Sequence, residues 1–383
     1  MILTINGGSS SIKFALYQTI PTLKRVHFGQ INGIGSSDTK FIVDNINLPC
    51  NANDLPSAVS CLVTWINENT STSKINAIGH RIVHGMQQIK TCLITNDLLK
   101  ELKSIILYDP DHLPTEIKLI EAFKIHYPQI KQFACFDTAF HQTIPRIAQL
   151  LPIPRRFEKQ GIRKYGFHGL SYQYLIKELE HLAGKKTAHG RVILAHLGNG
   201  ASLAAVYKGK SVDTSMGFTP AGGIPMSTRS GDIDPGVAWI MIKTEKLSPR
   251  QFDQVINHQS GLLGISGTNG DMSVLLSQED EDIHSAEAVD HFCYQVRKWI
   301  GAFAAALGGI DTLVFSGGIG EHSAAIRARI CGELGFLGIE LNNRENTKNS
   351  LLISKNKGRV PVYVIPTNEE LMIAELVSNM IDI

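Results

Sequence analysis

Two arginines lie in segments that are rich in histidine, glycine and small polar residues. Arg81 follows an apolar, strand-like run and has His80 and His84 close to it, whereas Arg229 is surrounded by Ser, Thr, Asp and Gly within 228–236. Two guanidinium groups can neutralise the negative charge of a phosphoryl group during its transfer. The Arg229 segment could equally be a structural loop with aspartate caps, and Arg81 alone is more simply interpreted as the end of a surface strand, so neither arginine decides the function by itself.

Two further side chains with acid–base or hydrogen-bonding capacity occur in similar contexts. Asp137 ends the apolar run 133–136, and open α/β sheets place ligands where such strands end. His168 lies in 165–169, between an aromatic residue and a glycine. A turn carboxylate and an ordinary hydrogen-bonding histidine are the alternative interpretations, and these residues gain weight only together with the arginines.

Three glycine-rich turns could supply backbone donors to phosphate groups. They lie within 2–13, 192–202 and 313–321, each after a strand-like apolar run. Glycine permits a close approach of the backbone to a ligand, so several N–H groups can converge on one anion. The first two turns are followed by another strand-like run, which predicts β-hairpins. Two such hairpins half a chain apart indicate a duplicated domain that holds one phosphate chain from both sides.

Phosphoryl transfer also needs a divalent cation that is held by oxygen atoms. Asn6 in the first turn and Glu369 or Glu370 near the C-terminus are candidate oxygen ligands. A Walker motif is absent, since Gly209-Lys210-Ser211 has alanine at the upstream position 204. The glycine-rich and catalytic loops of protein kinases are absent as well.

The remaining sequence indicates an α/β protein of two domains. Its 383 residues exceed what one core normally accommodates. Helices are predicted over 55–67, 114–126 and 368–380, and apolar residues at helical spacing predict a long one across 289–307. Strand-like runs alternate with these helices, which is typical of α/β folds.

Bulk composition excludes several classes of protein. A net charge of +2 gives no electrostatic footprint for nucleic acid or an anionic membrane. No apolar run is long enough to predict a membrane span or a signal peptide. The six cysteines form no Cys-x-x-Cys pair, which argues against zinc and favours reduced thiols in a cytoplasm.

Long stretches of the chain resemble the acetate kinase family, or more broadly the acetate/propionate kinases. The resemblance implies two duplicated domains with the fold of actin, Hsp70 and sugar kinases (ribonuclease H-like), with a central cleft, and a homodimer. It implies ATP or ADP as co-substrate, Mg²⁺ (or Mn²⁺) as cofactor, and acetate and acetyl phosphate as the other substrates. The matching stretches are 6–13, 79–85, 136–145, 163–169, 196–200, 213–220, 228–235, 318–321 and 366–374.

The resemblance also implies roles for individual residues. Asn6 and Glu369 are similar to magnesium ligands, and Asp137 to a residue that orients the substrate arginines. The implied catalytic residues are Arg81, Arg229, Asp137, His168 and Asn199. The implied nucleotide contacts are Ser9, Ser11, Lys13, His196, Gly198, Asn199, Gly200, Asp271, Gly318, Ile319, Gly320 and Glu321. The implied pocket for the methyl group consists of Val83, Leu107, Phe167 and Pro220.

The chain departs from the family pattern at a few positions. Met86 stands where the family usually has glycine, and Tyr108 where it has a histidine that faces the active site. Ser273 stands where an arginine commonly stacks on adenine.

These observations predict an N-terminal, acyl-side domain of residues 1–145 plus the closing helix 370–383, and a nucleotide-binding domain of residues 146–369. The predicted reaction is reversible, Mg²⁺-dependent, in-line transfer of the ATP γ-phosphoryl group to acetate. One alternative is a propionate kinase of the same family. The other, of a different class, is a non-catalytic nucleotide-binding module, which would not need Arg81, Arg229 and His168.

Overall fold

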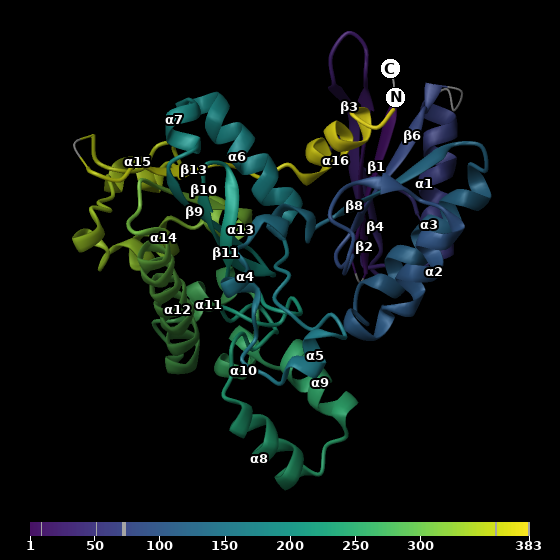
Figure 1. Cartoon of the computed structure of the whole chain (residues 1–383). Coiled ribbons are helices and arrows are strands. Elements are labelled where there is room, and N and C mark those ends of the chain that lie inside the picture. Colours follow the sequence, from purple (N-terminus) through teal and green to yellow (C-terminus); the bar gives the residue numbers. More distant parts are fainter. Residues whose placement is uncertain (9, 51, 71–73, 357, 382–383) are drawn as a thin grey trace. The chain divides into compact units, whose positions relative to one another are not determined.

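The chain folds into two compact units, drawn in Figure 1. The computed structural model describes residues 1–8, 10–50, 52–70, 74–356 and 358–381. Unit 1 comprises Met1–Ala139, Gly169–Tyr174 and Asn368–Ile383, and unit 2 comprises Phe140–His168 and Leu175–Thr367.

Unit 1 is built on one mixed sheet in the order β5-β4-β3-β2-β1-β6-β8-β7. Strands β1, β2 and β3 pair antiparallel, whereas β1, β6 and β8 run parallel, so the carboxyl ends of these last three meet at one edge. Its elements are β1 (Ile2–Gly7), β2 (Ser11–Gln18), β3 (Lys24–Asn32), β4 (Lys40–Val43), β5 (Ile46–Leu48), α1 (Leu55–Asn69), β6 (Ala77–Ile82), β7 (Cys92–Leu93), α2 (Asn96–Ser104), η2 (Ile106–Tyr108), α3 (Leu113–His126), β8 (Lys131–Phe136) and α16 (Glu369–Ser378).

Both faces of this sheet are covered, because alternate strand residues point to opposite sides. On one face Leu3 and Ile5 pack with apolar residues of α1 and α3. On the other face Ile2 packs with Ile373 of α16, which Figure 1 shows in yellow beside β1 and β6. The last helix of the chain thus completes the core of its first domain.

Unit 2 repeats the same plan in a sheet of order β11-β10-β9-β12-β13. The long helix α12 packs against this sheet with the apolar face that its helical spacing predicts. The elements are η3 (Ala139–Thr143), α4 (Arg146–Gln149), α5 (Arg155–Glu158), α6 (Gly169–Ala183), α7 (Lys185–Ala188), β9 (Arg191–Leu197), β10 (Ala201–Tyr207), β11 (Lys210–Thr214), α8 (Pro235–Glu245), α9 (Pro249–His258), α10 (Gly261–Ser266), α11 (Met272–Gln278), α12 (Ile283–Leu307), β12 (Thr312–Ser316), α13 (Gly317–His322), α14 (Ala324–Cys331), η4 (Gly335–Leu337), α15 (Asn343–Thr347) and β13 (Val362–Val364); η3 and α6 begin in unit 1.

The two sheets confirm the predicted duplication. In each, three antiparallel strands are followed by two parallel ones, so β3-β2-β1-β6-β8 corresponds to β11-β10-β9-β12-β13. The glycine turns near Gly7 and Gly198 connect antiparallel neighbours, as the sequence predicts for hairpins. The third turn differs because its strand, β12, leads directly into the short helix α13.

The domain boundaries differ from the predicted ones in three places. Phe140–Pro145 belongs to unit 2, where His141 contacts Ser211 and the carbonyl of Phe167. Gly169–Tyr174 belongs to unit 1, because Leu170 packs into its core. Glu369 also belongs to unit 1, since it accepts a hydrogen bond from Asn6. Isolated contacts of this kind leave no signal in composition.

The described helices include none with the length and apolarity that a membrane crossing requires.

Stability should depend on pH through His80, which is 1% exposed in β6. Burial lowers the pKa of His80 from 6.5 to about 4, and its hydrogen bond to Gln132 opposes this shift only in part. Between these two values the unfolded chain binds a proton that the native state rejects. The contribution of His80 to stability is therefore complete above pH 6.5 and is lost as the pH falls towards 4, by about 1.4 kcal/mol per pH unit.

Urea unfolding of the wild type and of His80→Gln between pH 4.5 and 7 measures this contribution. The difference between the two free energies should shrink steadily as the pH falls, because only the wild type carries the titrating ring. Two parallel pH profiles would show that His80 does not titrate in this way.

Candidate active site

At the carboxyl edge of the sheet in unit 1, a buried ion pair joins two neighbouring strands. Arg81 near the end of β6 donates from Nε and Nη2 to Oδ2 of Asp137, which directly follows β8, at 3.0 and 2.6 Å. The Asp137 side chain is fully buried and that of Arg81 is 16% exposed. Parallel pairing of β6 with β8 explains why two residues 56 positions apart meet here.

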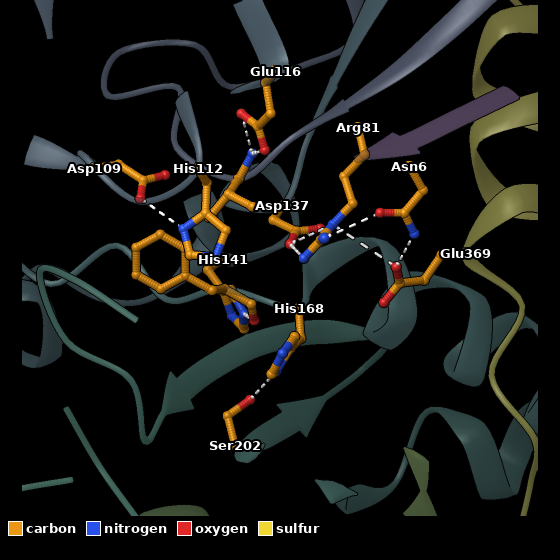
Figure 2. A network of polar contacts seen from close by, with 12 residues as sticks. Asn6, Arg81, Asp109, His112, Glu116, Asp137, His141, His168, Ser202 and Glu369 are labelled. Atoms are coloured by element: carbon orange, nitrogen blue, oxygen red, sulfur yellow. Dashed lines mark hydrogen bonds and ion pairs between the residues drawn. The ribbon is translucent and has the colours of Figure 1, made fainter. Parts of the chain in front are cut away.

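Asn6 and Glu369 extend this cluster, as Figure 2 shows. Asn6 near the end of β1 accepts from Nη1 of Arg81 at 3.1 Å and donates to Glu369 Oε2 at 2.9 Å. Glu369 begins α16, and its carboxylate also lies 3.8 Å from Nε of Arg81. Four residues that the sequence singled out are therefore brought together within one unit.

Their electrostatics keep Arg81 charged. Burial alone would lower the pKa of Arg81, but the charges of Asp137 and Glu369 outweigh it and raise that pKa. Burial raises the pKa of Asp137, and Arg81 opposes that shift. Burial also raises the pKa of Glu370, with the neighbouring charge of Glu369 adding to it. The cluster thus offers a fixed cation beside closely spaced carboxylates.

The oxygen atoms at this edge suit a magnesium ion. Asn6 and Glu369 supply an amide and a carboxylate oxygen, which are the hard donors that Mg²⁺ prefers. Among the described residues, no three or more His, Cys, Asp or Glu side chains gather into a closed metal site. A magnesium ion here would therefore take its remaining ligands from water and substrate phosphate, as is usual for this ion.

In unit 2, two histidines stack beside the second glycine turn. The rings of His168 and His196 lie 4.4 Å apart. Nδ1 of His168 contacts the hydroxyl of Ser202 at 2.9 Å, a contact that Figure 2 shows as a dashed line. His168 has a left-handed backbone with φ of +57°, a conformation that costs free energy in a non-glycine residue and concentrates at functional sites. The structure thus holds the ring of His168 in one orientation.

Arg229 lies close to the same turn. The Asn199 carbonyl accepts from the Ser227 N–H at 3.1 Å, which ties the 198–200 turn to the loop that carries Arg229. A Cβ placed on Gly200 would lie 3.4 Å from Nε2 of His168 and 3.9 Å from Nη1 of Arg229. Gly200 is therefore the point at which the turn, the histidine and the arginine converge.

The third glycine turn adjoins the second. Gly317 has φ of +75°, and a Cβ there would lie 2.6 Å from the Leu197 carbonyl oxygen, so only glycine fits. Glu321 Oε1 accepts from the N–H groups of Gly317 and Thr367 at 2.8 and 3.1 Å. The predicted nucleotide contacts Gly318, Ile319 and Gly320 lie between Gly317 and Glu321 in α13. Glu321 therefore holds its own loop in place.

Other predicted nucleotide contacts lie in mixed positions. Asp271 caps α11 by accepting from the N–H groups of Ser273 and Val274, so the structure gives it a local role. Lys13 is exposed on β2, opposite Asn6 in the hairpin register, and Ser11 begins that strand. Ser9 lies outside the described residues. The nucleotide assignments of these residues stay predictions.

The residues predicted for the methyl pocket differ in exposure. Val83 and Phe167 are 2% and 1% exposed, and Pro220 is half-buried. Leu107, in contrast, is 83% exposed, so the surrounding residues do not enclose its side chain. Its proposed contact with the methyl group stays a prediction.

Sequence reasoning missed two residues that support the site. Ser202 orients His168, and its position two residues after Gly200 gives no specific signal. Glu116 accepts from the backbone N–H of Val83. A signal for it existed, because Glu116 interrupts the apolar face formed by Leu113, Ile117 and Ile120.

Comparison with known proteins identifies relatives along the entire chain. The model of the acetokinase family matches residues 1–375. An acetate kinase from Rhodopseudomonas palustris (strain TIE-1) is 39% identical over 400 residues, which covers 100% of this chain and 98% of that protein. An acetate kinase from Nitrobacter hamburgensis is 41% identical over 385 residues, which covers 98% of this chain and 94% of that protein.

Solved structures show the same likeness. A propionate kinase from Francisella tularensis matches with a TM-score of 0.92 at 36% identity, and 98% of each chain is covered. An acetate kinase from Porphyromonas gingivalis matches with a TM-score of 0.87 at 34% identity, again over 98% of each chain.

The buried ion pair generates a prediction about stability. Asp137→Asn replaces the hydrogen-bonded carboxylate of the Arg81 guanidinium with a neutral amide and leaves Glu369, at 3.8 Å, as its nearest counter-charge, so the free energy of unfolding should fall by about 3 kcal/mol. Asp97→Asn is the matched control, since its pair with Lys100 in the same unit is almost fully exposed and should change stability by less than about 0.5 kcal/mol. Denaturant unfolding of both variants measures the two effects, and equal losses would contradict the burial of the Arg81–Asp137 pair.

Proposed function

This chain belongs to the acetokinase family, and from that membership we propose that it transfers the γ-phosphoryl group of ATP reversibly to acetate, giving acetyl phosphate and ADP. It is a phosphotransferase with ATP as co-substrate. The observation that supports the acyl-acceptor part most directly is the buried network of Arg81, Asp137, Asn6 and Glu369. It combines a fixed cation for a carboxylate with oxygen donors for a metal ion.

In the proposed mechanism, the acetate carboxylate attacks the γ-phosphorus in line. The carboxylate is already a charged nucleophile, so no general base is required. Asp137 binds two nitrogens of Arg81 and thereby fixes the direction of the guanidinium. The remaining task of the side chains is alignment and neutralisation of charge, which can contribute most of the acceleration in phosphoryl transfer.

Residues of unit 2 have matching roles in the proposal. Arg229 neutralises charge on the phosphoryl oxygens, and His168 and Asn199 donate hydrogen bonds to them. The turn from His196 to Gly200 and the segment from Gly318 to Glu321 contact the nucleotide phosphates and base. Support comes from the convergence of His168, Arg229 and the turn at Gly200.

We further propose Asn6 and Glu369 as ligands of Mg²⁺, with Mn²⁺ as a substitute. When bound, the ion screens the charge of the β- and γ-phosphates. The donor chemistry and the shared position of the two side chains support this assignment.

The acyl specificity is proposed as acetate, with propionate as the alternative. Curated relatives carry the name acetate kinase, whereas one of the most similar structures is a propionate kinase. One methylene in an apolar pocket changes specificity by only about 1–3 kcal/mol, so both acids are expected to react. A hydroxamate assay with acetate, propionate and butyrate tests the proposal, and a higher kcat/KM for propionate would change the acyl assignment but leave the kinase assignment intact.

A non-catalytic nucleotide module is the weaker alternative. Such a module needs the glycine turns but gains nothing from an Arg81–Asp137 pair whose burial costs free energy.

A cytoplasmic location stays a prediction.

We propose that a second copy of the chain covers helix α8, giving the homodimer that the family resemblance implies. Within the described chain, α8 buries none of its residues. It exposes Val237, Trp239 and Ile240 at 46%, 64% and 56%. A cluster of exposed apolar side chains of this kind is typical of a surface that binds another protein.

The two arginines generate a prediction about activity. Arg81→Ala and Arg229→Ala should each lower kcat by about 10²-fold or more, because each removes a cation that stabilises developing charge. Steady-state kinetics with acetate, together with circular dichroism to verify folding, measure the effect. Near-normal turnover in either folded variant would remove that arginine from the mechanism.

Helix α8 generates a prediction about assembly. Trp239→Asp should shift the protein from dimer to monomer, because it places a charge in the middle of the apolar surface. Ile125→Asp is the control, since Ile125 is a similarly exposed apolar residue, 78% accessible, on helix α3 of unit 1. Light scattering after size-exclusion chromatography distinguishes the outcomes, and a Trp239→Asp dimer would place the interface elsewhere.

A further inference from the structure

The backbone that follows β6 has little freedom. A Cβ on Gly85 would lie 2.4 Å from Cδ1 of Phe136, so this segment presses against the end of β8. Met86 has a left-handed backbone with φ of +49°, and its N–H donates to Nδ1 of His84 at 3.1 Å. The segment 83–86 therefore has a strained and defined conformation, and it begins two residues after Arg81, which is proposed to bind the acyl carboxylate.

A buried carboxylate holds the start of this segment. Glu116 of α3 is 2% exposed, and its Oε1 and Oε2 accept from the N–H of Val83 at 3.0 and 3.3 Å. Figure 2 shows the Glu116 carboxylate facing this backbone nitrogen. Because β6 ends at Ile82, the N–H of Val83 would otherwise need an acceptor outside the ladder.

Burying a carboxyl group at this position costs more free energy than burying an apolar side chain would. Glu116 occupies the apolar face of α3 beside Ile117 and Ile120, where an apolar side chain would pack without desolvating a charge. Burial raises the pKa of Glu116 well above its usual value, the charge of Asp109 adds to this, and Arg81 opposes it. Asp109 itself contacts Nδ1 of His112 at 2.8 Å, one turn before Glu116. An acidic group that is retained in such surroundings points to a role at the site.

We propose that Glu116 is a positioning residue for the acyl substrate: by holding the Val83 N–H it fixes the depth of the acyl pocket beside Arg81. The Val83 side chain, itself 2% exposed, is the pocket wall that this hydrogen bond sets in place. Loss of this hydrogen bond would let Val83 move relative to the guanidinium of Arg81, which lies two residues earlier in the chain. The inference rests on the proposed function, since it concerns the acyl acceptor and not the nucleotide.

Two substitutions separate the hydrogen bond from the charge. Glu116→Gln removes the ionisable carboxyl group but keeps a carbonyl oxygen that accepts from the N–H of Val83. Glu116→Leu removes the acceptor and provides an apolar side chain that fits the helix face, so the variant should fold. Glu121→Leu on the same helix is the control, because Glu121 forms an exposed pair with Lys103.

The experiment measures KM and kcat for acetate, propionate and ATP, and hydrogen–deuterium exchange of peptides that contain residues 82–86. We expect Glu116→Leu to raise the KM for acetate about tenfold and to change the acetate/propionate ratio of kcat/KM at least threefold. The KM for ATP should stay within twofold, and the 82–86 amides should exchange faster. Glu116→Gln should keep the exchange and the acyl ratio of the wild type, as should Glu121→Leu.

Three results would overturn the inference. One is an unchanged acyl KM and unchanged exchange in Glu116→Leu. Another is an equal rise in the KM values for ATP and acetate, which marks a general structural defect. The third is a Glu116→Gln variant that behaves like Glu116→Leu, which would assign the effect to charge. Turnover of acetate and propionate by the wild type is measured separately, and absence of turnover would refute the proposed function. Even then, the hydrogen–deuterium exchange data would report whether Glu116 holds residues 82–86.

Discussion

The buried pair of Arg81 and Asp137 is the interaction on which the rest of the site depends. It exists because β6 and β8 are parallel neighbours, so their carboxyl ends deliver both side chains to one edge of the sheet. Asn6 reaches the same edge from β1, the next strand. Glu369 reaches this edge from α16, whose apolar residues pack on one face of the same sheet. One sheet therefore positions residues from both ends of the chain.

The sequence predicts regular elements well, because they are encoded locally. The hairpin turns near Gly7 and Gly198 follow from glycine between two apolar runs, and α12 follows from apolar residues at helical spacing. The duplication could be inferred from the similarity of those hairpins, before the strand orders confirmed it. The grouping of Arg81, Asp137, Asn6 and Glu369, in contrast, was available only through resemblance, since no spacing indicates that β6 pairs with β8.

Long-range packing is where sequence reasoning failed. The placement of Gly169–Tyr174 in unit 1 depends on Leu170 entering the core with Ile2 and Ile373, and no composition change marks it. Glu116 was overlooked because a glutamate in a helix is usually solvent-exposed. Its position on the apolar face of α3 was the available signal, and interpreting it required knowing that the Val83 N–H lies opposite.

Burial of ionisable groups is the common physical theme of unit 1, and in the proposed mechanism it lets a site that needs no general base select its substrate. Arg81, Asp137 and Glu116 are all withdrawn from water, so each is held by a specific partner and none can reorient at low free-energy cost. A carboxylate substrate that enters such an environment finds its cation already oriented, which avoids the reorganisation that water would impose. Within this scheme Asp137 fixes the direction of the guanidinium, and Glu116 fixes the backbone two residues later. In the proposed mechanism the two carboxyl groups thereby separate recognition of charge from the size of the acyl pocket, so we expect substitutions at Glu116 to change the acyl preference while the Arg81–Asp137 pair remains intact.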